Sequence, residues 1–120
     1  MEILISEAHN GSVVIKLSGR LVFDPVLYTL RPRIKEILDS GIKAIIFDLT
    51  EVPHCDSSGI GEMIVAYTSI RKRGAAAAFV GLTSRVFLLW ERINVTKVFD
   101  IFGTQQEAEN FLAAARSPQE

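Results

Sequence analysis

Nonpolar residues recur at every second position near the start of the chain, which is the period of β-strands, although the intervening Leu4 and Val14 are nonpolar too. The alternating nonpolar positions are Ile3, Ile5, Val13, Ile15 and Leu17. The dipeptide Asn10-Gly11 separates the two runs, and this pair is a strong short-range signal for a hairpin turn. We therefore expect the chain to open with a β-hairpin.

Nonpolar residues then recur at intervals of three and four, as they do on one face of an α-helix. These residues are Leu27, Leu30, Ile34, Ile37 and Leu38. Asp24 is a candidate N-cap with Pro25 at the first helical position, and Gly41 supplies a helix stop. Pro32 would remove a backbone hydrogen bond from a helix interior and clash with the preceding turn, at about 3 kcal/mol or more. We therefore expect an irregular first turn or a kink, with the regular helix beginning near Arg31.

Two strand-length nonpolar runs follow, and each precedes a segment with helical spacing. KAIIFDL, residues 43–49, is nearly continuous, which is typical of a strand covered on both faces. The helix pattern after it ends at RKRG, with cations near the negative end of the helix. Its expected buried face comprises Ile60, Met63, Ile64, Tyr67 and Ile70. AAAAFVG, residues 75–81, is ambiguous because alanine favours helices, but its position between a helix end and a helix start favours a strand.

The last third of the chain predicts two more helices around a short extended segment. Thr83 or Ser84 can cap the first of them, and Thr104 and Glu107 form a capping box for the second. The nonpolar residues of these helices are Val86, Phe87, Trp90 and Ile93, then Ala108, Phe111, Leu112 and Ala115. KVFDIF between the helices is expected to be a short strand or an extended piece.

The predicted order is β-β-α-β-α-β-α-β-α. Strands that alternate with helices imply parallel β-α-β crossovers, so we expect an α/β fold with a mixed, mostly parallel central sheet opened by a hairpin and about four helices packed on it. A chain of 120 residues is the size of one domain. We place this domain at residues 1–115 and a C-terminal tail at residues 116–120.

Composition and charge narrow the function classes. Thirteen basic and fourteen acidic residues give a net charge of −1, which provides no electrostatic attraction for nucleic acid or an anionic membrane. The first residues do not resemble a secretory signal, and no run approaches the ~18 nonpolar residues of a membrane span. We expect a cytoplasmic protein without a direct nucleic-acid or membrane partner.

The chain contains a single cysteine, Cys55, so it forms no internal disulfide. His9 and His54 are the only histidines, and no set of residues has the spacing of a structural zinc site. Cys55 and His54 are interpreted as a buried strand end and a loop residue, and Trp90 as core or partly covered helix surface. We expect neither a metal nor a cofactor.

The sequence HCDSSGIG directly precedes the second predicted helix and concentrates polar and small residues there. Asp56, Ser57 or Ser58 can cap the helix, while Gly59 and Gly61 can allow it to pack closely on the sheet. Two serines and an aspartate are more than one cap requires. The loop after a parallel strand lies where ligands and reacting groups bind in open α/β sheets, so a surplus hydroxyl there is a candidate for chemistry.

The sequence gives less support to three other functions of such a loop: serine hydrolysis, phosphate binding and aspartate phosphorylation. The G-x-S-x-G element of a serine hydrolase is absent, and neither histidine has a context in which to act as a base. SSGIGE lacks the lysine of a phosphate-binding loop, which also disfavours nucleotide binding. Aspartate phosphorylation of the receiver type needs an acidic pair after the first strands, where only Asp24 is present.

The segment IIFDLTEVPHCDSSGIGEMIVAYTSIRKRG resembles the STAS domain of bacterial anti-sigma factor antagonists, in which a strand leads to D-S-[ST]-G-[ILM]-[GA] and a helix. KLSGRL is similar to the G-x-L element of that family, and TSRVFLLWERINVTKVFDIFGTQQEAENFL is similar to its closing elements. The likeness covers essentially the whole chain. GRLVFDP departs from the family because Asp24 comes two residues late and precedes a proline, and Pro32 is a second departure.

The resemblance implies a partner-switching role without enzymatic activity. The serine after the aspartate, Ser57, would be the phosphorylation site. The unmodified form would bind an anti-sigma factor, which is also the serine kinase, and thereby release the sigma factor; phosphorylation would end binding, and a serine phosphatase would restore it. The implied binding surface comprises Asp56, Ser57, Ser58, Gly59, Ile60 and Gly61, with Asp24. The alternative is a STAS scaffold or accessory module, in a stress-sensing assembly or a lipid-transport complex, without a switch.

Overall fold

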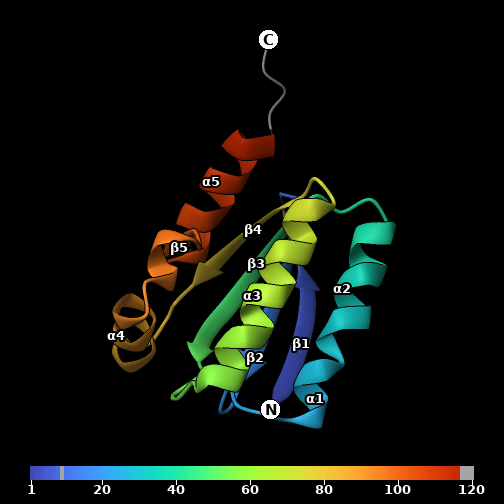
Figure 1. Cartoon of the computed structure of the whole chain (residues 1–120). Helices are drawn as coiled ribbons and strands as arrows, with labels where there is room; N and C mark the ends of the chain where they lie inside the picture. Colours follow the sequence, from blue (N-terminus) through green and yellow to red (C-terminus); the bar gives the residue numbers. More distant parts are fainter. Residues whose placement is uncertain (9, 117–120) are drawn as a thin grey trace.

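The computed structural model describes residues 1–8 and 10–116, which form one five-stranded sheet with helices on both faces (Figure 1). The strand order is β1-β2-β3-β4-β5; β1 is antiparallel to β2 and the other pairs are parallel. The strands are β1 (Glu2–Glu7), β2 (Val13–Ser18), β3 (Ala44–Glu51), β4 (Ala76–Val80) and β5 (Ile101–Phe102). The helices are α1 (Pro25–Tyr28), α2 (Leu30–Asp39), α3 (Ser57–Lys72), α4 (Ser84–Arg92), the short 3-10 helix η1 (Val95–Lys97) and α5 (Gln105–Arg116). The predicted α/β class and mixed sheet are confirmed.

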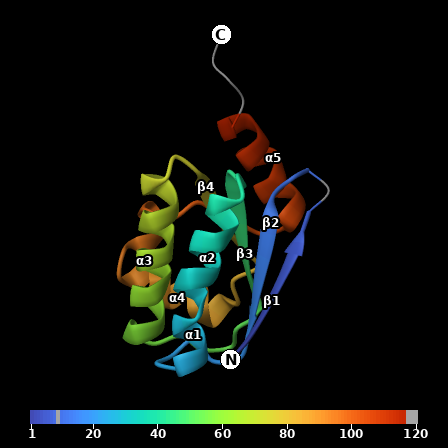
Figure 2. The ribbon, with the colours of Figure 1, turned by 90° about the vertical axis from the view of Figure 1, so that its right-hand side faces the viewer.

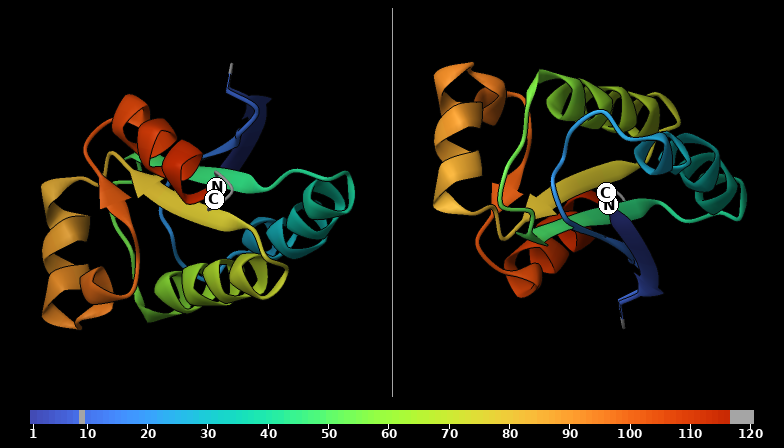
Figure 3. Two further views of the ribbon diagram at one scale, coloured as in Figure 1. Left: turned by 90° about the horizontal axis from the view of Figure 1, so that it is seen from above. Right: turned by 90° about the horizontal axis from the view of Figure 1, so that it is seen from below.

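Helices cover the two faces of the sheet unequally. α1, α2 and α3 lie on one face and α5 lies on the other, while α4 stands beside the β4–β5 edge (Figures 2 and 3). The larger core lies under α2 and α3 and extends to Trp90 of α4, which is fully buried. The smaller core, which includes Ile46, Val80 and Leu112, lies under α5. The sheet is thus buried on both faces at its centre, as the continuous nonpolar run in β3 indicates.

The opening hairpin forms as predicted. Ile3 pairs with Leu17 and Ile5 pairs with Ile15 across the two strands. Gly11 has a φ of 89°, a left-handed conformation that glycine adopts without a steric penalty. The turn is therefore built around Asn10-Gly11, as the sequence indicates.

The first helix is interrupted, as Pro32 predicts. α1 ends at Tyr28, and α2 begins at Leu30. Pro32 is the third residue of α2, where the backbone N–H would lack an intrahelical partner in any case. Asp24 caps α1, and its side chain accepts a hydrogen bond from the Val26 backbone N–H at 2.8 Å. The break therefore places proline where it costs little.

The buried face of α3 is narrower than predicted, and α4 also carries exposed nonpolar residues. Ile64 is 41% exposed, so its assignment to the buried face of α3 is wrong. Phe87 and Ile93 of α4 are exposed as well. Only Val86 and Trp90, four residues apart, are buried in α4, because this short helix contacts the sheet edge along one line. These side chains lie beside the buried stripes, so their hydrophobicity alone does not show whether a neighbouring element covers them.

The segment KVFDIF pairs with the sheet only at Ile101 and Phe102. Lys97 ends η1, and the buried Phe99 packs against Trp90 in the ring cluster of the core. The capping box predicted for α5 is present, because Thr104 Oγ1 accepts from the Glu107 N–H at 3.2 Å and Glu107 Oε1 accepts from the Thr104 N–H at 3.1 Å. The predicted boundary after residue 115 falls in the last turn of α5, and residues 117–120 lie outside the described part of the chain.

Candidate functional site

Backbone hydrogen bonds join the loops that follow β2 and β3, at the carboxyl ends of these two strands. The Leu21 N–H donates to the His54 carbonyl oxygen at 2.8 Å, and the Asp56 N–H donates to the Leu21 carbonyl oxygen at 3.2 Å. This pairing extends the parallel β2–β3 ladder beyond the ends of the two strands. It brings α1 and the first turn of α3 to the same end of the molecule (Figure 1). Asp24 therefore ends one of two adjacent loops and Ser57 begins the helix after the other, although 32 residues separate them in the sequence.

Asp56 is the cap of α3 among the three candidates. Its backbone is extended, and its side-chain Oδ1 accepts a hydrogen bond from the Gly59 N–H at 3.0 Å. A helix N-terminus needs acceptors for its first backbone N–H groups, and this carboxylate provides one. The cap therefore does not depend on either serine.

Ser57 and Ser58 are the first two residues of α3, and both are exposed. Within residues 1–8 and 10–116, neither hydroxyl has a hydrogen-bond partner. The positive end of the helix dipole stabilises negative charge at these positions. The arrangement can therefore accept an anionic group on either hydroxyl without loss of a structural hydrogen bond.

The two glycines of the motif have different roles. A Cβ atom on Gly59 would overlap the backbone carbonyl and the side chain of Leu21, so this position requires glycine for close packing. A Cβ atom on Gly61 would meet nothing within 4 Å, so the prediction that Gly61 also allows close packing is wrong. Gly59 and Ile60 are buried and hold the motif against the core. The accessible part of the predicted surface consists of Asp56, Ser57, Ser58 and Gly61 in the motif, together with Asp24.

Exposed nonpolar residues lie next to Asp24 in the sequence, and they were not predicted to be part of the site. Its Oδ2 atom is 3.4 Å from the amino group of Met1, in addition to its capping role. The preceding Phe23 is 66% exposed and packs edge-on against Tyr28, with ring centroids 5.6 Å apart. Val26 is exposed as well. An exposed nonpolar patch could have been predicted here, because nonpolar residues stand on both sides of the candidate cap Asp24 in the sequence.

His54 and Cys55, the first two residues of HCDSSGIG, directly precede the helix cap Asp56 and differ in burial. Cys55 is almost completely buried, as interpreted from the sequence, and burial raises the pKa of its thiol to about 11. A thiol with this pKa is a poor nucleophile at neutral pH, because the thiolate is the reactive form. His54 is half-buried, and His9 lies outside the described residues. The part of the chain that the structure describes contains no cluster of three or more potential metal-ligating side chains.

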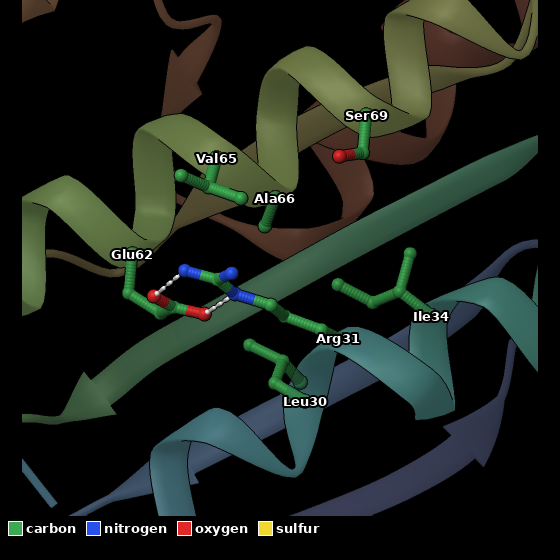
Figure 4. Close-up of a pocket in the computed structure, with 7 residues that line it drawn as sticks. All are labelled: Leu30, Arg31, Ile34, Glu62, Val65, Ala66 and Ser69. Atoms are coloured by element: carbon green, nitrogen blue, oxygen red, sulfur yellow. Dashed lines mark hydrogen bonds and ion pairs between the residues drawn. The ribbon is translucent and has the colours of Figure 1, made fainter.

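An ion pair between the exposed Arg31 of α2 and the buried Glu62 of α3 joins the two helices beyond the motif (Figure 4). Glu62 is 4% exposed and accepts hydrogen bonds from Arg31 Nε at 2.7 Å and Arg31 Nη2 at 2.8 Å. The pair closes one end of a groove of about 200 Å³ that is also lined by Ile34, Val65 and Ser69. Glu62 was not predicted as a site residue, because its partner Arg31 is 31 residues away in the sequence.

Comparisons with known proteins match this fold. The model of the STAS domain matches residues 4–108. The anti-sigma-B factor antagonist of Listeria monocytogenes serovar 1/2a is 33% identical over 81 residues, which are 63% of this chain and 70% of that protein. An anti-sigma factor antagonist from Mycobacterium paratuberculosis has a similar structure, with a TM-score of 0.76, 21% identity and 93% of each chain covered.

The structure of the anti-sigma factor antagonist SpoIIAA in its unphosphorylated form is also similar, with a TM-score of 0.70 and 16% identity over 98% of this chain and 100% of that chain. The phosphorylated form of the Bacillus cell fate determinant SpoIIAA matches with a TM-score of 0.69 and 17% identity over 92% of this chain and 98% of that chain. No helix within residues 1–8 and 10–116 has the length and nonpolar character that crossing a membrane requires. The family match over most of the chain, the identity to a curated relative and the shared fold agree: the chain belongs to the STAS domain family.

Proposed function

We propose that this chain is an anti-sigma factor antagonist of a partner-switching pathway. The unphosphorylated chain binds an anti-sigma factor and releases the sigma factor, and phosphorylation of Ser57 ends the binding. One observation carries the proposal: Ser57 is exposed at the first position of α3, while Asp56 caps the helix in its place. The curated relative named as an anti-sigma-B factor antagonist supports the same role.

The choice of Ser57 over Ser58 rests on the family resemblance and gains support from helix geometry. Residues four positions apart on a helix are surface neighbours, and Ser58 is four residues before Glu62. A phosphate on Ser58 would therefore lie on the side of α3 that carries the Glu62–Arg31 ion pair, where it would compete with Glu62 for the Arg31 guanidinium. The corresponding neighbour of Ser57 is Gly61, which has no charge and leaves open space around it.

A phosphate on Ser57 would act at the interface and leave the fold intact. It adds about −1.5 to −2 charges at a helix N-terminus, where the dipole stabilises an anion by about 0.3–1 kcal/mol. Against a partner surface, a like-charge contact at 4 Å costs about 4 kcal/mol at an effective dielectric constant of about 20. This energy corresponds to roughly a thousandfold loss of affinity.

The partners follow from this role. The anti-sigma factor is the serine kinase that modifies Ser57, and a serine phosphatase removes the phosphate. The chain itself is a regulator without catalytic activity and needs no cofactor. Its partners control the sigma subunit of RNA polymerase, so we place the chain in the cytoplasm.

Calorimetric titration tests this function. The anti-sigma factor is recovered by pull-down from the source organism, purified, and titrated with the unmodified chain, the enzymatically phosphorylated chain and the Ser57→Asp variant. We expect tight binding by the unmodified chain, roughly a thousandfold weaker binding by the other two, and an unfolding midpoint for Ser57→Asp close to that of the wild type. Equal affinity of all three forms would contradict the switch and favour the scaffold role.

A further inference from the structure

A groove of about 340 Å³ lies between α4 and the loop that leads into the helix cap Asp56. His54 and Cys55 line it from the loop, and Arg85, Leu88, Leu89 and Arg92 line it from α4. The groove therefore begins two residues before the helix cap Asp56. The proposed phosphorylation of Ser57 gives no role to the α4 side of this groove.

The groove combines positive charge with exposed nonpolar surface. Neither Arg85 nor Arg92 has an ion-pair partner among the residues that the structure describes. None of the described residues that line the groove carries a carboxylate. Leu88 lies between the two arginines and is 55% exposed, so it contributes nonpolar surface to the groove. Positive charge without a local counter-charge favours an acidic occupant.

The spacing of the charges defines the occupant further. Arg85 and Arg92 are seven residues apart, which is two helical turns, so they project from the same side of α4 about 10 Å apart along its axis. An acidic segment with two carboxylates about 10 Å apart and a nonpolar side chain between them matches this arrangement. Such spacing occurs between residues i and i+7 of a helix.

We propose that this groove docks an acidic, nonpolar-centred segment of the anti-sigma factor and thereby positions that partner over Ser57. The inference rests on the proposed function, because it names a second contact surface for the same partner. His54 belongs to the groove and to the loop that leads into Asp56, so the two surfaces are continuous. Exposed charge pairs of this kind act mainly on the association rate and its dependence on salt.

The test measures association rates with the anti-sigma factor, by stopped flow or surface plasmon resonance at several salt concentrations. We expect the double variant Arg85→Glu/Arg92→Glu to associate at least about tenfold more slowly than the wild type at low salt, with a weaker salt dependence. Leu88→Ala, at an exposed position that the fold does not need, is expected to raise the dissociation rate. The control is Arg33→Glu/Lys72→Glu, which makes the same change of charge at exposed residues of α2 and α3 away from the groove.

The outcomes separate this inference from the proposed function. If the wild type binds and Ser57→Asp does not, but Arg85→Glu/Arg92→Glu associates at the rate of the control, the groove inference is overturned and the switch stands. An unchanged dissociation rate for Leu88→Ala would also contradict the nonpolar contact. Absence of binding by the wild type would contradict both proposals. Thermal unfolding of each variant shows that a slower rate does not reflect loss of the fold.

Discussion

At the scale of single residues, Asp56 and Ser57 are adjacent in the sequence but have separate tasks at the start of α3. The Asp56 carboxylate accepts from the Gly59 N–H and holds the helix N-terminus. The Ser57 hydroxyl is exposed and has no hydrogen-bond partner in the described part of the chain. A residue that carries no structural hydrogen bond can be modified without loss of the fold, so this division of tasks suits a switch.

Substitution of the two residues by alanine is expected to separate these tasks. Asp56→Ala removes the cap, so the free energy of unfolding should fall by about 1 kcal/mol. Ser57→Ala should change it by less than about 0.5 kcal/mol, as for other exposed positions. Urea denaturation of both variants and the wild type measures the difference. A loss for Ser57→Ala equal to that for Asp56→Ala would show that the serine is structural.

Cys55 gives a prediction about pH at the same scale. Burial raises the pKa of its thiol from an ordinary value of 9.0 to about 11 in the folded chain. The folded chain thus holds this proton more tightly than the unfolded chain, so the stabilisation is fully present below pH 9 and is lost as the pH rises towards 11. The free energy of unfolding of the wild type should therefore fall relative to that of Cys55→Ala over this interval. Parallel pH profiles of the two proteins would contradict the burial of the thiol.

At the scale of elements, the two glycines of α3 show how the helix is placed against the β2–α1 loop. Leu21 lies opposite Cys55 and forms backbone hydrogen bonds with His54 and Asp56, and Gly59 leaves room for its carbonyl group. The first turn of α3 can approach Leu21 only because Gly59 has no side chain. This contact fixes the direction in which α3 presents Ser57.

Gly59→Ala and Gly61→Ala are therefore expected to have opposite effects. The first inserts a methyl group against a backbone carbonyl, and such overpacking costs about 1–3 kcal/mol. The second adds a methyl group in open space within a helix, which should stabilise the chain by about 0.5–1 kcal/mol. Thermal and urea unfolding compare the two variants directly. Equal destabilisation by both would contradict the packing described at Gly59.

The sequence pattern predicts the elements better than it predicts their contacts. The strand-helix order, the break before Pro32 and the capping box at Thr104 depend on residues close together in the chain, so all three could be predicted. The burial of Glu62 depends on Arg31, which is 31 residues away, and no local pattern contains that partner. Ile64 is exposed because no other element covers its side of α3, which again only the assembled fold shows.

At the scale of the whole molecule, the parallel sheet gathers the proposed partner surface at the carboxyl ends of β2 and β3. Backbone hydrogen bonds of Leu21 to His54 and Asp56 join the loops after β2 and β3, and α4 adds Arg85 beside the second loop. The motif and its position after a parallel strand could be predicted, because both are local. The basic groove could not, because it is formed only when α4 packs beside the loop at His54. This end of the sheet as a whole is the surface that we propose for the anti-sigma factor.

The most direct test of the central claim is to map the phosphate. The wild type, Ser57→Ala and Ser58→Ala are incubated with the purified anti-sigma factor kinase and ATP, and the modified peptides are sequenced by mass spectrometry. The account predicts one phosphate on Ser57 in the wild type and in Ser58→Ala, and none in Ser57→Ala. Phosphate on Ser58 or elsewhere in the wild type, or incorporation into Ser57→Ala equal to that of the wild type, would contradict it.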